Sequence, residues 1–153
     1  MAFALLLLII AGGMAYIRLA PSDPAHWHVK PEMSGAGGWT FLPPGADAVI
    51  AETGGARAAV TILGQSPEQV LAHLDAIAME TPRTVRLAGS PEDGVITWVT
   101  RSALFGFPDY TTAAVRPDGP ATVLTLHARL RFGRSDFGVN AARLRDWLTQ
   151  LSP

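Results

Sequence analysis

The longest apolar run in the chain lies at its N-terminus. Residues 2–17 carry no charge, and the long side chain of Arg18 can reach a membrane–water interface. At about 1.5 Å per residue this run forms a helix of roughly 24 Å, and continuing to Ala20 brings it close to the roughly 30 Å of a bilayer core. The pattern predicts one N-terminal membrane-spanning helix over residues 1–20, with Tyr16 at the interface.

Two alternatives to an uncleaved anchor stay open, a cleaved signal peptide and a buried soluble helix. Gly13 and Ala15 could flank a cleavage site, but a basic n-region is missing. The orientation is also open. Arg18 and Lys30 follow the span, so the positive-inside rule places the rest of the chain in the cytoplasm, whereas short bacterial anchors often export their domain.

The composition changes after the apolar run. Residues 21–45 are rich in proline and glycine and read as an extended linker. His26 and His28 flank Trp27, but two histidines without a third ligand nearby do not define a metal site. Trp27 fits a membrane-interface or docking residue better, and no metal site is predicted.

The next hundred residues alternate between short apolar runs and turn signals. Residues 48–51 and 58–63 predict a hairpin around the glycine pair at 54–55. Residues 66–69 form a capping-box pattern, Ser-Pro-Glu-Gln, which begins a helix with one apolar stripe that ends before Pro82. Further strands are expected at residues 84–88, 95–102, 111–116 and 122–132.

The last of these strands shows the clearest alternation. One face is apolar and is expected to contact the core, through Leu124, Leu126, Ala128, Leu130 and Phe132. The other face is polar, with Arg129 expected to face solvent, and carries Thr125, His127, Arg129 and Arg131. The Pro-Asp-Gly-Pro turn at 117–120 makes this strand antiparallel to the preceding one. A final helix is expected from Asn140 as its N-cap.

The order β-β-α-β-β-β-β-α predicts an α+β fold. We expect a mostly antiparallel sheet of about five or six strands with two helices packed on one face, preceded by one N-terminal transmembrane helix. The domain boundaries that follow are a membrane anchor at 1–20, a Pro/Gly-rich linker at 21–45 and a single globular domain at 46–153.

Composition removes several classes of function. The formal charge of −1 argues against a general nucleic-acid binder. The absence of cysteine removes disulfides, thiolate nucleophiles and iron–sulfur sites. No cofactor is predicted.

Positive charge gathers in the last third of the chain, which holds seven arginines and four aspartates. A polar sheet face carrying Arg101, His127, Arg129 and Arg131 would suit a carboxylate, a phosphate or an acidic partner. The alternative is that Asp109 and Asp136 pair with these arginines and hold two loops to the sheet.

The loop before the last helix allows two interpretations. Ser135, Asp136 and Asn140 can bond backbone N–H groups at the helix start. Alternatively, the helix start and Arg134 could bind an anion.

Two motifs carry a family resemblance, RSALFGFPDY at 101–110 and RFGRSDFGVN at 131–140. Over residues 64–151 the sequence resembles the bacterial domain of unknown function 1499 family. The resemblance implies an envelope protein of no established activity, with the domain in the periplasm. By position, the family-typical polar residues are Arg101, Asp109, Arg131, Ser135, Asp136, Asn140 and Arg143. Two features depart from the family pattern: Ala103 stands where a second arginine is common, and a cysteine-containing motif is absent.

These observations predict a single-pass protein of the bacterial inner membrane. Its predicted role is that of a non-enzymatic binding or accessory module, which binds a protein partner or a small anion. A hydrolase or transferase using Asp109, Asp136 and Ser135 is the first alternative, although no nucleophile-elbow pattern surrounds the serine. A structural accessory of a membrane complex is the second. The candidate binding residues are Arg101, Asp109, His127, Arg131, Arg134, Ser135, Asp136 and Asn140.

Overall fold

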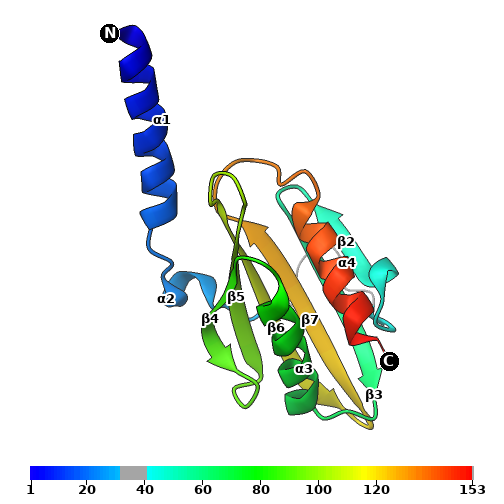
Figure 1. The fold of residues 1–153 in the computed structure, drawn as a ribbon. Helices are drawn as coiled ribbons and strands as arrows, with labels where there is room; N and C mark the ends of the chain where they lie inside the picture. Colours follow the sequence, from blue (N-terminus) through cyan, green and yellow to red (C-terminus); the bar gives the residue numbers. More distant parts are fainter. Residues whose placement is uncertain (32–40, 153) are drawn as a thin grey trace.

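The computed structural model describes residues 1–31 and 41–152 (Figure 1). Helix α1 (Ala2–Leu19) projects from the rest of the molecule, and none of its residues is buried. Among the described residues it is the one helix long and apolar enough to cross a membrane. The predicted apolar N-terminal helix is therefore present, ending one residue before the predicted boundary.

The described residues form an α+β domain around one sheet, as predicted (Figure 1). The strands run in the order β1-β3-β7-β6-β5-β4, with β2 beside β3 on the same edge as β1. All pairings are antiparallel except that of β1 with β3. The strands are β1 (Phe41–Leu42), β2 (Val49–Glu52), β3 (Gly55–Leu63), β4 (Thr84–Ser90), β5 (Val95–Arg101), β6 (Pro108–Asp118) and β7 (Ala121–Leu130).

Three helical elements accompany the sheet in the domain, the 3-10 helix η1 (Ala46–Ala48) and helices α3 (Pro67–Glu80) and α4 (Val139–Leu151). The predicted capping box begins α3: the Ser66 hydroxyl accepts from the Gln69 N–H at 3.2 Å, and the Gln69 side chain accepts from the Ser66 N–H at 2.9 Å. Both α3 and α4 pack on one face of the sheet, as predicted.

The core lies between these two helices and the sheet. Trp98 of β5 meets Trp147 of α4 edge to face, with ring centroids 5.5 Å apart. Each indole N–H has an acceptor, Asp75 for Trp98 at 2.8 Å and Thr81 for Trp147 at 2.8 Å. The strand face predicted to be apolar contributes Leu124, Leu126 and Ala128, all fully buried.

Two local predictions are wrong. Helix α4 is preceded by Gly138, which adopts a left-handed conformation with φ of 80°, so Asn140 is not the N-cap but the second helical residue. Phe132 does not extend the core face, because β7 ends at Leu130. Its ring instead contacts Phe107 and Tyr16, with centroids 6.2 and 6.3 Å away.

The chain after α1 is packed where an extended linker was expected. Residues 20–31, which we call the cover segment, contain helix α2 (Pro24–Trp27) and bond to the face of the sheet opposite α3 and α4. Gly89 of β4 permits one of these contacts, since a Cβ there would lie 2.8 Å from the His28 ring. Residues 32–40 of the predicted linker lie outside the described residues.

Candidate binding face

The sheet face opposite α3 and α4, called the polar face below, is built by strand alternation. Because successive side chains point to opposite sides of a strand, His127 and Arg129 of β7 share a face with their cross-strand partners Thr112 and Tyr110 of β6. Arg57 of β3 lies opposite His127 on the same face. The arginine-bearing face predicted from β7 therefore exists.

Two arginines of the polar face bind main-chain carbonyls of the cover segment. Arg129 Nη2 donates to the carbonyl oxygen of Trp27 at 2.9 Å, and Arg131 Nη1 donates to that of Pro21 at 2.8 Å. Hydrogen bonds from a charged donor are stronger than neutral ones. The guanidinium groups thus hold the backbone of the segment at two points six residues apart in sequence.

An aromatic stack lies between these two points. The indole of Trp27 is parallel to the ring of Tyr110, with an angle of 7° between the planes. The guanidinium of Arg129 lies 5.5 Å from the Trp27 ring centroid, within the range of a cation–π contact. The Tyr110 hydroxyl bonds to Ser22 at 2.7 Å and accepts from Arg131 at 3.2 Å. Tyr110 is fully buried by this arrangement.

A row of threonines continues the contact. His28 Nδ1 lies 2.9 Å from the hydroxyl of Thr97, which lies 2.9 Å from that of Thr112. Both threonines have no exposed surface, although they stand on the polar face. The cover segment buries them and also completes their hydrogen bonding.

The cover segment corrects the expectation that Arg129 faces solvent. The residue is half-buried, and its Nε is buried without a hydrogen-bond partner among the described residues. Burial lowers the pKa of Arg129 from its ordinary value. Its charge is therefore partly withdrawn from water and is offset by the Trp27 carbonyl and ring.

Another part of the polar face carries a smaller charged group. The carboxylate of Glu52 lies 3.2 Å from Nε of Arg57 and 3.8 Å from Nε2 of His127. Burial is the largest cause lowering the pKa of His127, and nearby Arg129 adds to the effect, whereas Glu52 opposes it. His127 therefore belongs to the group around Glu52 on the polar face.

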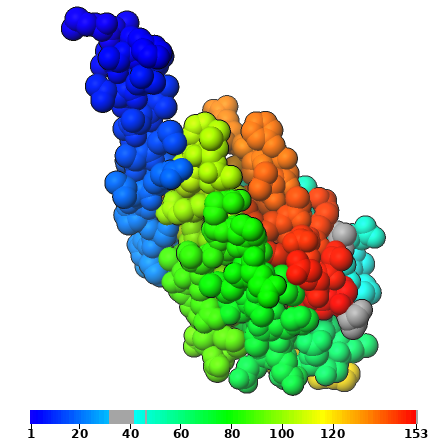
Figure 2. All heavy atoms as spheres, viewed as in Figure 1, coloured from blue at the N-terminus to red at the C-terminus, as the bar shows by residue number. Residues whose placement is uncertain are grey.

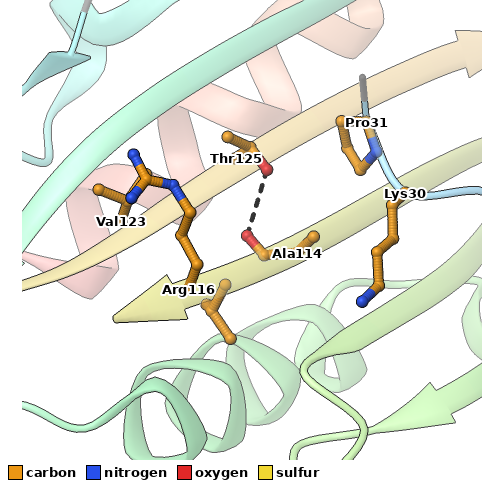
Figure 3. Close-up of a pocket in the computed structure, with 7 residues that line it drawn as sticks. Lys30, Pro31, Ala114, Arg116, Val123 and Thr125 are labelled. Carbon is orange, nitrogen blue, oxygen red and sulfur yellow. Dashed lines mark hydrogen bonds between the residues drawn. The ribbon is translucent and has the colours of Figure 1, made fainter. Parts of the chain in front are cut away.

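A hollow of about 200 Å³ opens where the described part of the cover segment ends. Figure 3 shows Lys30 and Arg116 on opposite sides of it, with Thr125 donating to the carbonyl of Ala114 at 3.2 Å on its floor. Arg116 lies 3.7 Å from Asp118 at the end of β6. Positive charge thus remains at one end of the polar face.

The opposite face of the sheet holds a second polar cluster. Asp109 of β6 accepts from Arg143 at 3.3 Å and from the Asn140 side chain at 3.2 Å. The Asn140 oxygen accepts from Arg143 at 2.8 Å, which closes the network. Burial raises the pKa of Asp109, while Arg143 opposes that rise. Asp109 thus pairs with a helix arginine and not with the sheet arginines expected from the sequence.

The neighbouring loop caps α4. The carboxylate of Asp136 accepts from the N–H groups of Gly138 at 3.2 Å and Asn140 at 2.9 Å. Burial by itself raises the pKa of Asp136, but these backbone hydrogen bonds outweigh it and lower the pKa. The Ser135 hydroxyl accepts from the Phe137 N–H at 3.2 Å. Asn140 was also expected to cap backbone groups, but its side chain bonds Asp109 and Arg143.

The predicted site residues therefore separate into three groups. His127 and Arg131 lie on the polar face. A second group, on the helix side of the sheet or at the start of α4, consists of Asp109, Asp136 and Asn140. The sheet therefore separates His127 from Asp109. Arg101, the last residue of β5, joins the first group, because its register places it on the same side of the sheet as Thr97; its Nη1 donates to the Gly106 carbonyl of the β5–β6 loop at 3.0 Å. Ser135 and the exposed Arg134 lie in the loop before α4.

Sequence reasoning did not find the central aromatic contact of the polar face. Tyr110 was not singled out, although it is the aromatic partner of Trp27. Trp27 was noted as a docking residue, but its partner lies 83 positions away in the sequence. The one available signal was an aromatic directly before the Thr-Thr-Ala-Ala run of this strand.

The fold and the polar face define a class of protein, an α+β domain joined to an apolar N-terminal helix, with the chain after the helix packed on the open side of the sheet. The model of the family described as "Protein of unknown function (DUF1499)" matches residues 44–151, and the chain belongs to this family. This confirms the resemblance carried by the two loop motifs.

A solved structure with similarity to this chain is the crystal structure of DR_A0006 from Deinococcus radiodurans. The two are 16% identical and superpose with a TM-score of 0.41, covering 63% of this chain and 92% of that one. No curated protein matches the sequence.

Proposed function

We propose that this protein is a membrane-anchored, non-catalytic binding module whose polar face binds a polypeptide segment. Its own cover segment occupies that face here. The observation that carries the proposal is the way Arg129 and Arg131 hold the carbonyls of Trp27 and Pro21 while Tyr110 stacks on the indole. Main-chain bonds with one aromatic side chain are a usual means of recognising a peptide.

The polar cluster on the other side of the sheet supports a structural role over catalysis. Asp109 is paired with Arg143, and both oxygens of the Asp136 carboxylate accept backbone N–H groups. The Ser135 hydroxyl accepts from a backbone N–H as well. A general base or nucleophile has to reach its substrate, and these groups are engaged with the protein itself.

We further propose that α1 anchors the protein in the bacterial inner membrane with the domain in the periplasm. The length and apolarity of α1 support the anchor, and the family resemblance supports the periplasmic side. Alkaline phosphatase fused to the C-terminus is active only in the periplasm, so an active fusion is expected. An inactive fusion would place the domain in the cytoplasm.

A small anion is a second candidate ligand of the polar face. The hollow between Lys30 and Arg116 favours it, because two cations flank a space of about 200 Å³. Phosphate titrated into the full-length protein should shift amide resonances of the residues around this hollow, and Lys30→Gln should remove the shift.

The peptide proposal is tested by competition in trans. A fluorescent peptide with the sequence of residues 20–31 is added to the full-length protein in detergent, and binding is followed by anisotropy. Wild type should bind it weakly, because the tethered segment competes at a high effective concentration. Trp27→Ala should weaken the tethered segment and raise the affinity for the labelled peptide.

Two controls define the site. Arg129→Gln added to the Trp27→Ala protein should reduce peptide binding, whereas Arg145→Gln, on the exposed side of α4, should not. A peptide with alanine in place of its tryptophan should bind more weakly than the original. Failure of the peptide to bind the folded Trp27→Ala protein would show that the segment is a fixed part of the domain, and the proposal would be wrong.

A further inference from the structure

Two loops at one end of the sheet lie against the last turn of α1. They are residues 102–107, between β5 and β6, and residues 131–138, between β7 and α4. Arg18 Nη2 donates to the Leu104 carbonyl at 3.0 Å, and the Tyr16 ring meets Phe132 edge to face at 6.3 Å. Figures 1 and 2 show the β5–β6 loop beside the lower part of α1, while the rest of the helix extends away.

The same loops expose large apolar side chains. Leu104 is 70% exposed and Phe137 is 95% exposed, and Phe105 and the adjoining first residue of α4, Val139, are also exposed. An apolar patch at loop tips is common where a protein meets another surface. These side chains are not part of the buried hydrophobic core.

Positive charge lies next to this apolar patch. A hollow of about 350 Å³ is lined by Arg18, Arg83 and Arg101. Gly106 lets the first of these approach the loop, because a Cβ there would lie 2.9 Å from Cγ of Arg18. Three guanidinium groups around one hollow suit a phosphate group.

The position of these loops relative to α1 indicates what meets them. Helix α1 has 18 residues and is therefore about 27 Å long, slightly less than the roughly 30 Å of a bilayer core. If α1 spans a membrane, Tyr16 and Arg18 lie at its surface, where such side chains are favoured. The loops that contact these two residues must then lie at the same depth.

We infer that this end of the domain docks on the bilayer in which α1 is anchored. The side chains of Leu104, Phe105 and Phe137 enter the interfacial layer, and the arginine hollow receives the phosphate of an anionic lipid headgroup. The inference rests on the membrane anchor proposed above and is independent of the peptide site. It gives the domain a fixed orientation on the membrane, with the polar face standing beside the anchor.

The absence of cysteine makes the test direct, because each single-cysteine variant can be labelled at one site. We would attach an environment-sensitive fluorophore to Leu104→Cys and to Phe137→Cys in the full-length protein. The matched control is Asp118→Cys, which lies exposed at the other end of β6, about 33 Å from its start at 3.3 Å per residue. The proteins are placed in phosphatidylcholine vesicles with and without phosphatidylglycerol, and nitroxide-bearing lipids serve as quenchers.

The emission of labels at 104 and 137 should shift to the blue, and the quencher lipids should lower its intensity. Both effects should be larger in vesicles that contain phosphatidylglycerol. The label at 118 should do neither. Arg18→Gln combined with Arg83→Gln should remove the dependence on phosphatidylglycerol, whereas Arg145→Gln should retain it. A dependence that persists without Arg18 and Arg83 would overturn the headgroup site.

Flotation of the vesicles separates this inference from the proposed anchor. Protein that floats while labels at 104 and 137 behave like the one at 118 would overturn the docking inference and leave the anchor intact. Protein that does not float would contradict the anchor, and the docking inference with it. A blue shift without quenching by the lipids would indicate contact between copies of the chain instead of lipid, and would also overturn it.

Discussion

The indole of Trp27 lies parallel to the ring of Tyr110, with ring centroids 3.8 Å apart. This contact joins the chain that follows α1 to the middle of the sheet. It is reinforced on both sides, by the carbonyl bonds from Arg129 and Arg131. The orientation of the domain relative to α1 therefore depends on the polar face as well as on covalent connection.

Removing the Trp27 ring is expected to release the cover segment. In Trp27→Ala the stack and the cation–π contact disappear, and an aromatic pair contributes about 0.5–1.5 kcal/mol beyond the area it buries. Amide exchange of residues 20–31 should accelerate while that of α3 stays unchanged. Trp27→Phe keeps a ring over Tyr110 and should retain most of the protection. Equal exchange in all three proteins would show that the segment is held by its backbone bonds alone.

The strands and helices of the domain could be predicted because local pattern decides them. The alternation in β7 and the capping box of α3 are each contained within about ten residues, and both are found as expected. The packing of the cover segment could not be predicted in this way. Its proline content indicates an extended chain, and its partners, from Thr97 on β5 to Arg131 just after β7, lie 69 to 110 residues away.

The buried pair of Asp109 and Arg143 provides a second prediction. Their side chains are 16% and 8% exposed, so Arg143→Met leaves a buried carboxylate without its cation, which should cost about 3–5 kcal/mol in the free energy of unfolding. The double variant Asp109→Asn, Arg143→Met should lose less than Arg143→Met alone, because the remaining amide carries no charge.

The matched control for this pair is Arg116→Met. Arg116 is an exposed arginine of β6 that lies 3.7 Å from Asp118, and an exposed ion pair contributes only about 0–1 kcal/mol. Denaturant unfolding of the three variants and wild type measures the differences. A loss in Arg143→Met no larger than in Arg116→Met would mean that the network around Asp109 is not a structural element of the fold.

The candidate site was predicted less completely than the fold. The sequence correctly placed His127 on a polar face, because strand parity fixes the face of each side chain within β7. Arg131 lies just beyond the strand and reaches the same face through its hydrogen bond to the Tyr110 hydroxyl. It could not identify the partner of Asp109, since Arg143 lies on a helix 34 residues later and the sheet arginines were equally suitable in charge. Phe132 was assigned to the core by extending the alternation past Leu130, where the strand ends.

Asp136 is expected to stabilise the start of α4. Its carboxylate accepts two backbone N–H groups, and losing such a cap costs about 0.5–2 kcal/mol. Asp136→Ala should therefore lower the unfolding midpoint more than Ser135→Ala, which removes one acceptor in the loop. Arg129→Ala should also cost more than the roughly 0.5 kcal/mol typical of an exposed residue, because Arg129 is half-buried against Trp27.

The last prediction concerns pH and His127. Burial and the neighbouring arginines Arg129 and Arg57 lower the pKa of His127 from its ordinary 6.5, against the attraction of Glu52. Between 6.5 and the lower pKa of the folded protein, the unfolded chain binds a proton that the folded protein does not. This residue's contribution to stability is therefore full above about pH 6.5 and declines as the pH falls through that window.

We expect His127→Gln to become more stable relative to wild type at about pH 5.5 than at about pH 7.5. Denaturant unfolding at both pH values measures this, with His73→Gln, an exposed histidine of α3, as the matched control. A difference between His127→Gln and wild type that is the same at both pH values would mean that His127 takes up its proton equally in the folded and unfolded chains, and that the polar face does not disfavour a further positive charge there.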